Sequence, residues 1–184
     1  MRNPVIIVFT GTSGSGRKTV AHRIGRELGL THVVSATTRQ PRERDISGKD
    51  YHYISEEQFA SAERDGRFVQ TAKIGQHRYG VLLRELEQAL SAGRPVYLIL
   101  NKEGASAIKA LYGERVIRLF LYVDKQTVRE RLESKGTRYD VVEQYLESYT
   151  DEVIYRKQCE LVIQNRELGE TVRLARAAIV ALLP

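Results

Sequence analysis

The sequence predicts an α/β fold in which helices cover a largely parallel sheet, and three observations lead to this prediction. Short, unbroken apolar runs, which are typical of strands buried on both faces, recur along the chain. Between them lie segments whose apolar residues repeat every three or four positions, as in amphipathic helices. The first apolar run leads directly into a glycine-rich loop, which in such folds lies at the carboxyl edge of the sheet, where ligands bind.

The first half of the chain supplies alternating elements. Val20, Ile24 and Leu28 recur at four-residue spacing and predict one face of a helix that ends near Gly29. Ser55, with Gln58 three positions later, predicts a capping box at the start of another helix. In order, we expect a strand at 5–9, a helix at 20–28, a strand at 31–38, a polar turn-rich loop at 39–55, a helix after Ser55 and a strand at 67–74.

The second half continues the alternation. Gly93 and Pro95 end a helix that is predicted from the leucine spacing before them. Asp124 is a good N-cap for a helix that carries Val128 and Leu132. We expect a helix at 82–90, interior strands at 96–100 and 116–122, helices at 124–132 and 141–153, a strand at 161–163 and a final helix at 168–183.

Composition restricts the class of protein. A chain of 184 residues, 42% hydrophobic and without a linker-like segment, predicts one domain. No apolar run is long enough for a membrane span, and the first residues lack the features of a signal peptide. The single cysteine, Cys159, excludes an internal disulfide framework and, with scattered histidines, predicts a cytoplasmic protein without a metal cluster. The net charge of +6 favours anionic partners, but dispersed basic residues make nucleic acid a weak candidate.

The glycine-rich loop, "GTSGSGRKT", is close to the phosphate-binding pattern G-x-x-x-x-G-K-[ST] but departs from it at two positions. Arg17 replaces the lysine that reaches the β- and γ-phosphates, and Lys18 replaces the hydroxyl that ligates magnesium. Thr19 follows one position too late for that hydroxyl role. The alternative is a glycine-rich turn without a phosphate role. The predicted phosphate loop comprises Gly11, Ser13, Gly14, Gly16, Arg17, Lys18 and Thr19.

Nearly the whole chain resembles the guanylate kinase family. The most specific part is "SATTRQPR" followed by "GKDYHYIS", and the similarity continues through "GRFVQTAKIGQHRYG", "LILNKEGA", "RERLESKGT" and "LVIQN". The resemblance implies a P-loop core that binds ATP, an inserted α+β domain that binds GMP and a short lid. Placed on this sequence, the core covers 1–34 and 82–184, with a lid around 125–150, and the insert covers 35–81.

The residues that hold the acceptor phosphate in that family are all matched here. Two guanidinium groups and three hydroxyls are well suited to a dianionic phosphate. For the two arginines alone, a solvated loop is the alternative interpretation. The resemblance implies that this site comprises Ser35, Arg39, Arg42, Tyr51 and Tyr79.

Other functional positions of the family are altered. Gln70 replaces a glutamate that accepts hydrogen bonds from guanine, and an amide offers only one acceptor group. Val81 replaces a hydroxyl residue, and Ile99 and Asn101 replace two acidic residues. In the lid, Arg131 matches a family arginine, whereas Lys135 and Tyr145 stand where arginines are expected. The implied catalytic positions are Arg17, Lys18, Arg131 and Lys135, and we expect no protein-bound metal.

Because the phosphate anchors remain while base-reading, metal and lid positions change, we predict a protein that binds a phosphorylated ligand with weak or no GMP phosphorylation. A precedent comes from the guanylate-kinase-like domains of scaffold proteins, which resemble the enzyme but bind phosphopeptides without catalysis. An active ATP-dependent guanylate kinase with a variant phosphate loop is the first alternative. The only cofactor that the sequence suggests is ATP with Mg²⁺, bound weakly. A protein-interaction domain without a small ligand is the second. Both a monomer and a dimer are compatible with the sequence.

Overall fold

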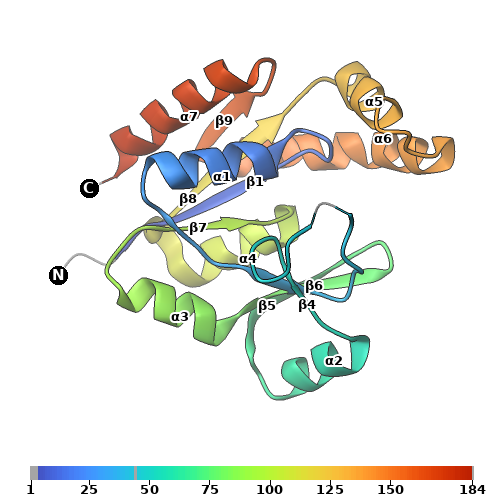
Figure 1. Cartoon of the computed structure of the whole chain (residues 1–184). Helices are drawn as coiled ribbons and strands as arrows, with labels where there is room; N and C mark the ends of the chain where they lie inside the picture. The colour runs from blue at the N-terminus through green and yellow to red at the C-terminus, as the bar shows by residue number, and fades with distance from the viewer. Residues whose placement is uncertain (1–3, 44, 184) are drawn as a thin grey trace.

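A computed structural model describes residues 4–43 and 45–183, and its framework is a five-stranded, entirely parallel sheet (Figure 1). This confirms the predicted α/β class. The strand order is β2-β7-β1-β8-β9, so the first strand of the chain lies in the centre. The strands are β1 (Ile6–Gly11), β2 (Thr31–His32), β7 (Val96–Ile99), β8 (Val116–Tyr122) and β9 (Leu161–Gln164).

Alternate residues of β1 face two separate cores. Ile6 and Val8 pack with residues of α3 and α4, whereas Ile7 and Phe9 pack with residues of α1 and α7. Side chains of a strand alternate between faces, so a continuous apolar run serves both cores at once. The helices that cover the sheet are α1 (Arg17–Glu27), α3 (Leu83–Ser91), α4 (Lys102–Tyr112) and α7 (Leu168–Leu182).

A second, four-stranded sheet is formed entirely by residues between Ser35 and Leu82. Its order is β4-β3-β6-β5, and β6 is antiparallel to both of its neighbours. The helix beside it begins with the predicted capping box, because the Ser55 hydroxyl and the Gln58 side chain bond each other's backbone N–H groups. The elements are β3 (Ser35–Thr37), β4 (His52–Tyr53), α2 (Glu56–Arg64), β5 (Phe68–Ile74) and β6 (His77–Leu82).

Two helices, α5 (Lys125–Glu133) and α6 (Tyr139–Ile154), lie together at the end of the main sheet remote from both termini (Figure 1). They share a small core of Val123, Val128, Val142 and Leu146. Short 3₁₀ turns, η1 (Gly113–Arg115) and η2 (Tyr155–Gln158), connect neighbouring elements. The predicted N-cap at Asp124 is confirmed, since its carboxylate accepts from the Thr127 N–H at 2.8 Å.

One predicted strand was wrong, and one α-helix and two strands were missed. The single strand expected at 31–38 is two strands in different sheets, because the chain leaves the main sheet after β2 and enters the second sheet at β3. Helix α4 and the strands β4 and β6 were not predicted. The polar residues at the start of β6 hide it from a search for apolar runs, although Gly75, with φ 59°, supplies the hairpin turn before it.

Arg118 is an unexpected charge in the interior of β8, with only 8% of its surface exposed. Its guanidinium group is 3.0 Å from Glu160 and donates to the Tyr155 hydroxyl at 3.1 Å. Pairing of this kind offsets part of the desolvation penalty for burying the charge. Among the residues described, no helix combines the length and apolar composition that a membrane span requires.

Candidate functional site

A cavity of about 740 Å³ lies where the glycine-rich loop, the second sheet and the α5–α6 pair meet. Its walls come from segments that are far apart in the sequence. The loop 12–19 forms one wall, residues of 35–51 and 70–79 form the second, and residues of 99–101 and 132–145 complete it. The loop follows β1 at the carboxyl edge of the parallel sheet, which is the edge predicted to bind a ligand.

The glycine loop has the conformation that its sequence predicts. Gly14 and Gly16 adopt φ values of 74° and 83°, and α1 begins directly after them at Arg17. At Gly11 an added Cβ would lie 1.9 Å from the Leu121 carbonyl oxygen, so a side chain cannot fit there. The loop therefore presents backbone N–H groups and a helix N-terminus to the cavity, the arrangement that favours phosphate.

One part of this loop already holds a carboxylate. Glu152, on α6, accepts hydrogen bonds from the Ser13 backbone N–H at 2.8 Å and from the Ser13 hydroxyl at 2.9 Å. A phosphate that occupied the same N–H would have to displace this carboxylate. Local sequence pattern does not reveal this contact, because Ser13 and Glu152 are 139 positions apart.

Arg17 does not fully replace the lysine of a phosphate loop. Its guanidinium group lines the cavity but donates to the Leu100 carbonyl oxygen at 3.0 Å. Burial lowers the pKa of Arg17 from its ordinary value, and the nearby Glu152 carboxylate opposes that shift. Because the Arg17 guanidinium already bonds the residue that follows β7, Arg17 is less free than a lysine to contact a phosphate.

Lys18 points toward the polar loop that precedes β4. Its ammonium nitrogen lies 2.6 Å from Asp50 Oδ1 and 3.3 Å from Asp45 Oδ1. Burial acts to raise the pKa of Asp50, but the hydrogen bonds from Lys18 and the Ile46 N–H, together with the charge of Lys18, lower it overall. The side chain at the expected metal-binding position therefore serves as the counter-ion of two carboxylates.

All five predicted phosphate anchors line this cavity, so the structure brings them together beside the glycine loop. The Tyr51 and Tyr79 rings are 5.7 Å apart, and the Arg39 guanidinium lies 5.6 Å from the Tyr51 ring centre. Burial raises the pKa of Tyr51, so its hydroxyl remains protonated and able to donate. The anchors are Ser35, Arg39, Arg42, Tyr51 and Tyr79.

Asp45 was not recognised from the sequence. It accepts hydrogen bonds from the Arg39 guanidinium at 2.7 Å and from the Arg42 backbone N–H at 2.9 Å. Burial by itself raises the pKa of Asp45, but these two donors outweigh it and hold the pKa well below the ordinary value. This carboxylate therefore orients Arg39 and also provides an anion at the predicted phosphate site.

The predicted base-site positions do not all face the cavity. Gln70, Ile99 and Asn101 line it, whereas Val81 is fully buried in the core. A β-bulge lies between Phe68 and Gln70, and such irregularities re-aim side chains beside functional sites. Asn101 Oδ1 accepts from the Gly104 N–H at 3.0 Å and caps α4.

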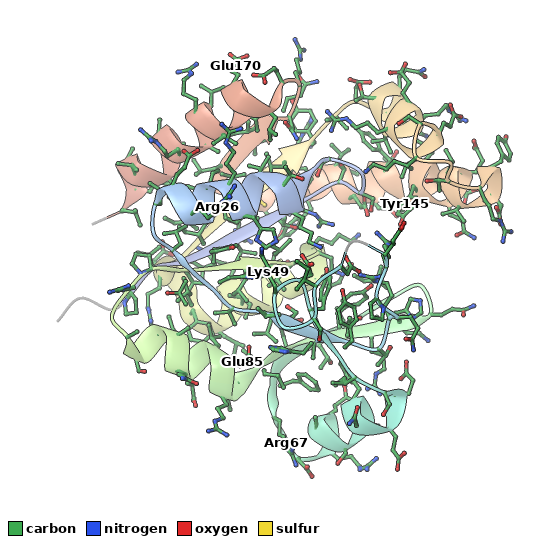
Figure 2. The ribbon with its side chains drawn as sticks, in the orientation of Figure 1. Arg26, Lys49, Arg67, Glu85, Tyr145 and Glu170 are labelled. Atoms are coloured by element: carbon green, nitrogen blue, oxygen red, sulfur yellow. The ribbon has the colours of Figure 1, made fainter. Side chains whose placement is uncertain are left out.

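The predicted lid residues also separate into two groups. Lys135 and Tyr145 line the cavity, and Figure 2 shows Tyr145 pointing from α6 toward the side of the molecule that holds the second sheet. Arg131 is absent from the lining among the described residues. Its guanidinium donates to the Gly14 carbonyl at 3.4 Å and to the Asn165 carbonyl at 3.0 Å, so it supports the glycine loop from behind.

These contacts decide how well magnesium and ATP would fit. Gly14, Gly16 and the start of α1 suit a phosphate chain. Magnesium bound to a nucleotide keeps several waters and takes the phosphates and only one or two protein oxygens as ligands. Asp45 and Asp50 are paired with Lys18, and the Asn101 oxygen caps a helix. The residues present therefore fit phosphate and do not fit a magnesium ion.

Comparisons with known proteins agree with the resemblance in the sequence. The family model described as guanylate kinase matches residues 1–181. A guanylate kinase of Wolinella succinogenes is 34% identical over 182 residues, covering 95% of this chain and 84% of that protein. A guanylate kinase of Caldanaerobacter subterraneus subsp. tengcongensis is 31% identical over 180 residues, covering 96% and 87%.

A solved structure supports the fold. The crystal structure of guanylate kinase from Anaplasma phagocytophilum superposes with a TM-score of 0.80 over 99% of this chain and 88% of that chain. Its sequence is 24% identical, so the likeness speaks to fold alone. Helices α1, α3, α4 and α7 and the two sheets thus form an architecture that another protein is known to adopt.

Proposed function

The chain belongs to the guanylate kinase family, and we propose that it binds a phosphorylated ligand at the acceptor side of the cavity, with weak or no phosphorylation of GMP. The ligand's phosphate is held by Arg39, Arg42 and the hydroxyls of Ser35, Tyr51 and Tyr79. Charge-assisted hydrogen bonds to phosphate are the strongest polar contacts available to such a site.

The observation that carries this proposal is the engagement of Lys18. A phosphoryl-transfer site of this family needs a metal beside the donor phosphates, since the metal neutralises the charge that develops there. Here the position of the metal-binding hydroxyl holds an ammonium group bonded to Asp45 and Asp50. Lys18 lines the cavity as a paired cation, whereas the acceptor anchors that line it keep the residue types that hold a phosphate. This division favours binding over transfer.

An active guanylate kinase is the second candidate. Its support is that the glycine loop and the acceptor anchors line one cavity, so that a donor and an acceptor phosphate could meet there. Curated relatives at about one-third identity also carry that name. In this case Arg17 would neutralise donor charge directly, Arg131 would support the loop, and ATP would bind without a protein-held metal.

The phosphorylated ligand of the first candidate can also be a protein that carries the phosphate, in keeping with a binding domain.

We place the protein in the cytoplasm because its one cysteine cannot form an internal disulfide. Cys159 is free, and burial raises the pKa of its thiol to about 12, so it is a poor nucleophile.

Calorimetry with GMP, AMP, guanosine and inorganic phosphate tests the proposal. We expect GMP and AMP to bind within a few-fold of each other and guanosine to bind hardly at all. Arg39→Ala and Arg42→Ala should each weaken GMP binding by about tenfold or more, because a charge-assisted hydrogen bond contributes roughly 1.5–3 kcal/mol.

The matched control is Arg67→Ala, since Arg67 lies remote from the cavity and its side chain is 65% exposed (Figure 2). It removes the same charge and should leave binding unchanged. Strong selection of GMP over AMP, or affinity that survives loss of both anchor arginines, would contradict the proposal.

A further inference from the structure

One side of the cavity contains an amide oxygen without a hydrogen-bond partner among the described residues. Gln70 lines the cavity, and its Oε1 is buried with no hydrogen-bond partner among the residues described. Whichever way the terminal amide is turned, it presents one acceptor and one donor. A buried polar atom left unsatisfied is costly, so its persistence beside a cavity points to a ligand group that completes it.

A second amide lies next to Gln70. A Cβ placed on Gly104 would lie 3.2 Å from Gln70 Nε2, 3.3 Å from Gln70 Oε1 and 3.3 Å from Asn101 Oδ1. The two amides therefore surround one point, and the absence of a side chain at Gly104 leaves room for both. Asn101 Oδ1 is already used to cap α4, which leaves the amide N–H₂ of Asn101 as the group it can offer a ligand.

Together these amides form a small recognition set with one free acceptor and two donors. A carboxylate in place of Gln70 would be acceptor-only and would suit the two adjacent N–H groups of guanine. The two amides instead offer one hydrogen-bond acceptor and two donor groups. An N–H flanked by two carbonyl oxygens matches them, because the N–H donates to the acceptor and each oxygen accepts from one donor.

We propose that Gln70 and Asn101 select a base with an imide edge, which is a ring N–H between two carbonyl groups, as in uracil and xanthine. The inference rests on the proposed function, because the phosphate anchors position the nucleotide whose base is read. With guanine, the exocyclic 2-amino group meets an amide donor and stays unpaired. Adenine can pair its 6-amino group and N1 with the Gln70 amide, but its C2–H leaves the Asn101 N–H₂ unpaired.

The test measures binding of UMP, XMP, GMP, AMP and ribose 5-phosphate to the whole chain by calorimetry. We expect UMP or XMP to bind at least about tenfold more tightly than GMP and AMP, which is the size of effect produced by one unpaired polar group. UMP and XMP separate a pyrimidine site from a purine site. Ribose 5-phosphate reports on the phosphate anchors alone.

Two variants each exchange an amide donor for a carboxylate acceptor and keep the size of the side chain. Gln70→Glu should shift the ratio of GMP to UMP affinity toward GMP by about tenfold, because a carboxylate accepts both guanine N–H groups. Asn101→Asp keeps the cap on α4, since aspartate is an equally good N-cap, but loses the donor, so it should weaken the imide ligand. The control is Gln88→Glu, the same chemical change on the exposed face of α3.

The outcomes separate this inference from the proposed function. If all nucleotides and ribose 5-phosphate bind alike and depend on Arg39, the phosphate site stands and the base preference is wrong. If GMP binds most tightly and Gln70→Glu does not alter the ratio, the inference is also wrong. If nothing binds, the proposed function and this inference fail together.

Discussion

The Lys18 ammonium lies 2.6 Å from Asp50 Oδ1 and 3.3 Å from Asp45 Oδ1, so an ion pair joins the first turn of α1 to the loop that carries the acceptor anchors. Asp45 also accepts from Arg39 at 2.7 Å, which links the phosphate loop to an anchor residue through one carboxylate. The cation at the metal position is thus part of the acceptor site, and this contact explains why we favour binding over transfer.

The double change Arg17→Lys with Lys18→Ser should raise the affinity for ATP in the presence of magnesium by about tenfold. A lysine can reach the phosphates, and a hydroxyl at position 18 can ligate the metal. Calorimetry of ATP with and without magnesium measures the change. Arg17→Lys alone is the control, because it restores the lysine but leaves Lys18 paired with Asp50.

The natural protein should bind ATP weakly and with little dependence on magnesium. If it already binds ATP with magnesium at micromolar level, and the double change weakens that binding, our account of the phosphate loop is wrong.

Stability should fall as the pH decreases from about 6.5 toward 4 because of His32. Burial, with the charge of His22 next, lowers the pKa of His32 to about 4. A histidine whose folded pKa is depressed contributes its full stability above the unfolded value of about 6.5 and loses it as the pH falls through the folded value. With partial exposure taken into account, we expect a loss of about 1–2 kcal/mol by pH 4.5.

The variant His32→Phe tests this assignment. It keeps an aromatic ring stacked on Tyr97, where the two rings are now 4.6 Å apart, but it cannot take up a proton. Urea unfolding at several pH values should show a flatter profile for this variant than for the natural chain. His77→Phe, in the β5–β6 hairpin, is the control and should keep the natural profile; a flattened profile for both variants would refute the role of His32.

Gly11→Ala should destabilise the fold by about 3 kcal/mol, because the added Cβ would lie 1.9 Å from the Leu121 carbonyl oxygen and force two parallel strands apart. Gly48→Ala is the matched control. Gly48 has φ 76° and open space around its Cβ position, so alanine there costs only about 1 kcal/mol of backbone strain. Chemical denaturation measures both, and equal losses would show that the contact at Leu121 is not the cause.

The sequence predicted the interior strands well because burial on both faces leaves an unbroken apolar run, as in β1. It predicted one strand at 31–38 because β-favouring residues do not reveal where a chain changes sheets. Arg118 shows another limit. Its burial depends on Glu160, which is 42 positions away and could not be paired with it from local pattern.

The candidate site was likewise predicted only in part. The resemblance supplied the five phosphate anchors, and they meet in one cavity. It could not supply Asp45 as the partner of Arg39, or Glu152 at the phosphate loop, because both contacts depend on how separate segments close around the cavity. Val81 was assigned to the base site from its position in a motif, but in the antiparallel pair it faces the core.

Phosphorylation of GMP by ATP in the presence of magnesium distinguishes most directly between a binding protein and an active kinase. Each lost electrostatic group in such a site reduces turnover on the order of a hundredfold, and here the loop lysine, the metal-binding hydroxyl and the acidic positions are all altered. A coupled assay on the purified chain should therefore detect almost no ADP formation that depends on GMP. Turnover within the usual kinase range of about 1–100 per second would contradict the account and establish an active enzyme.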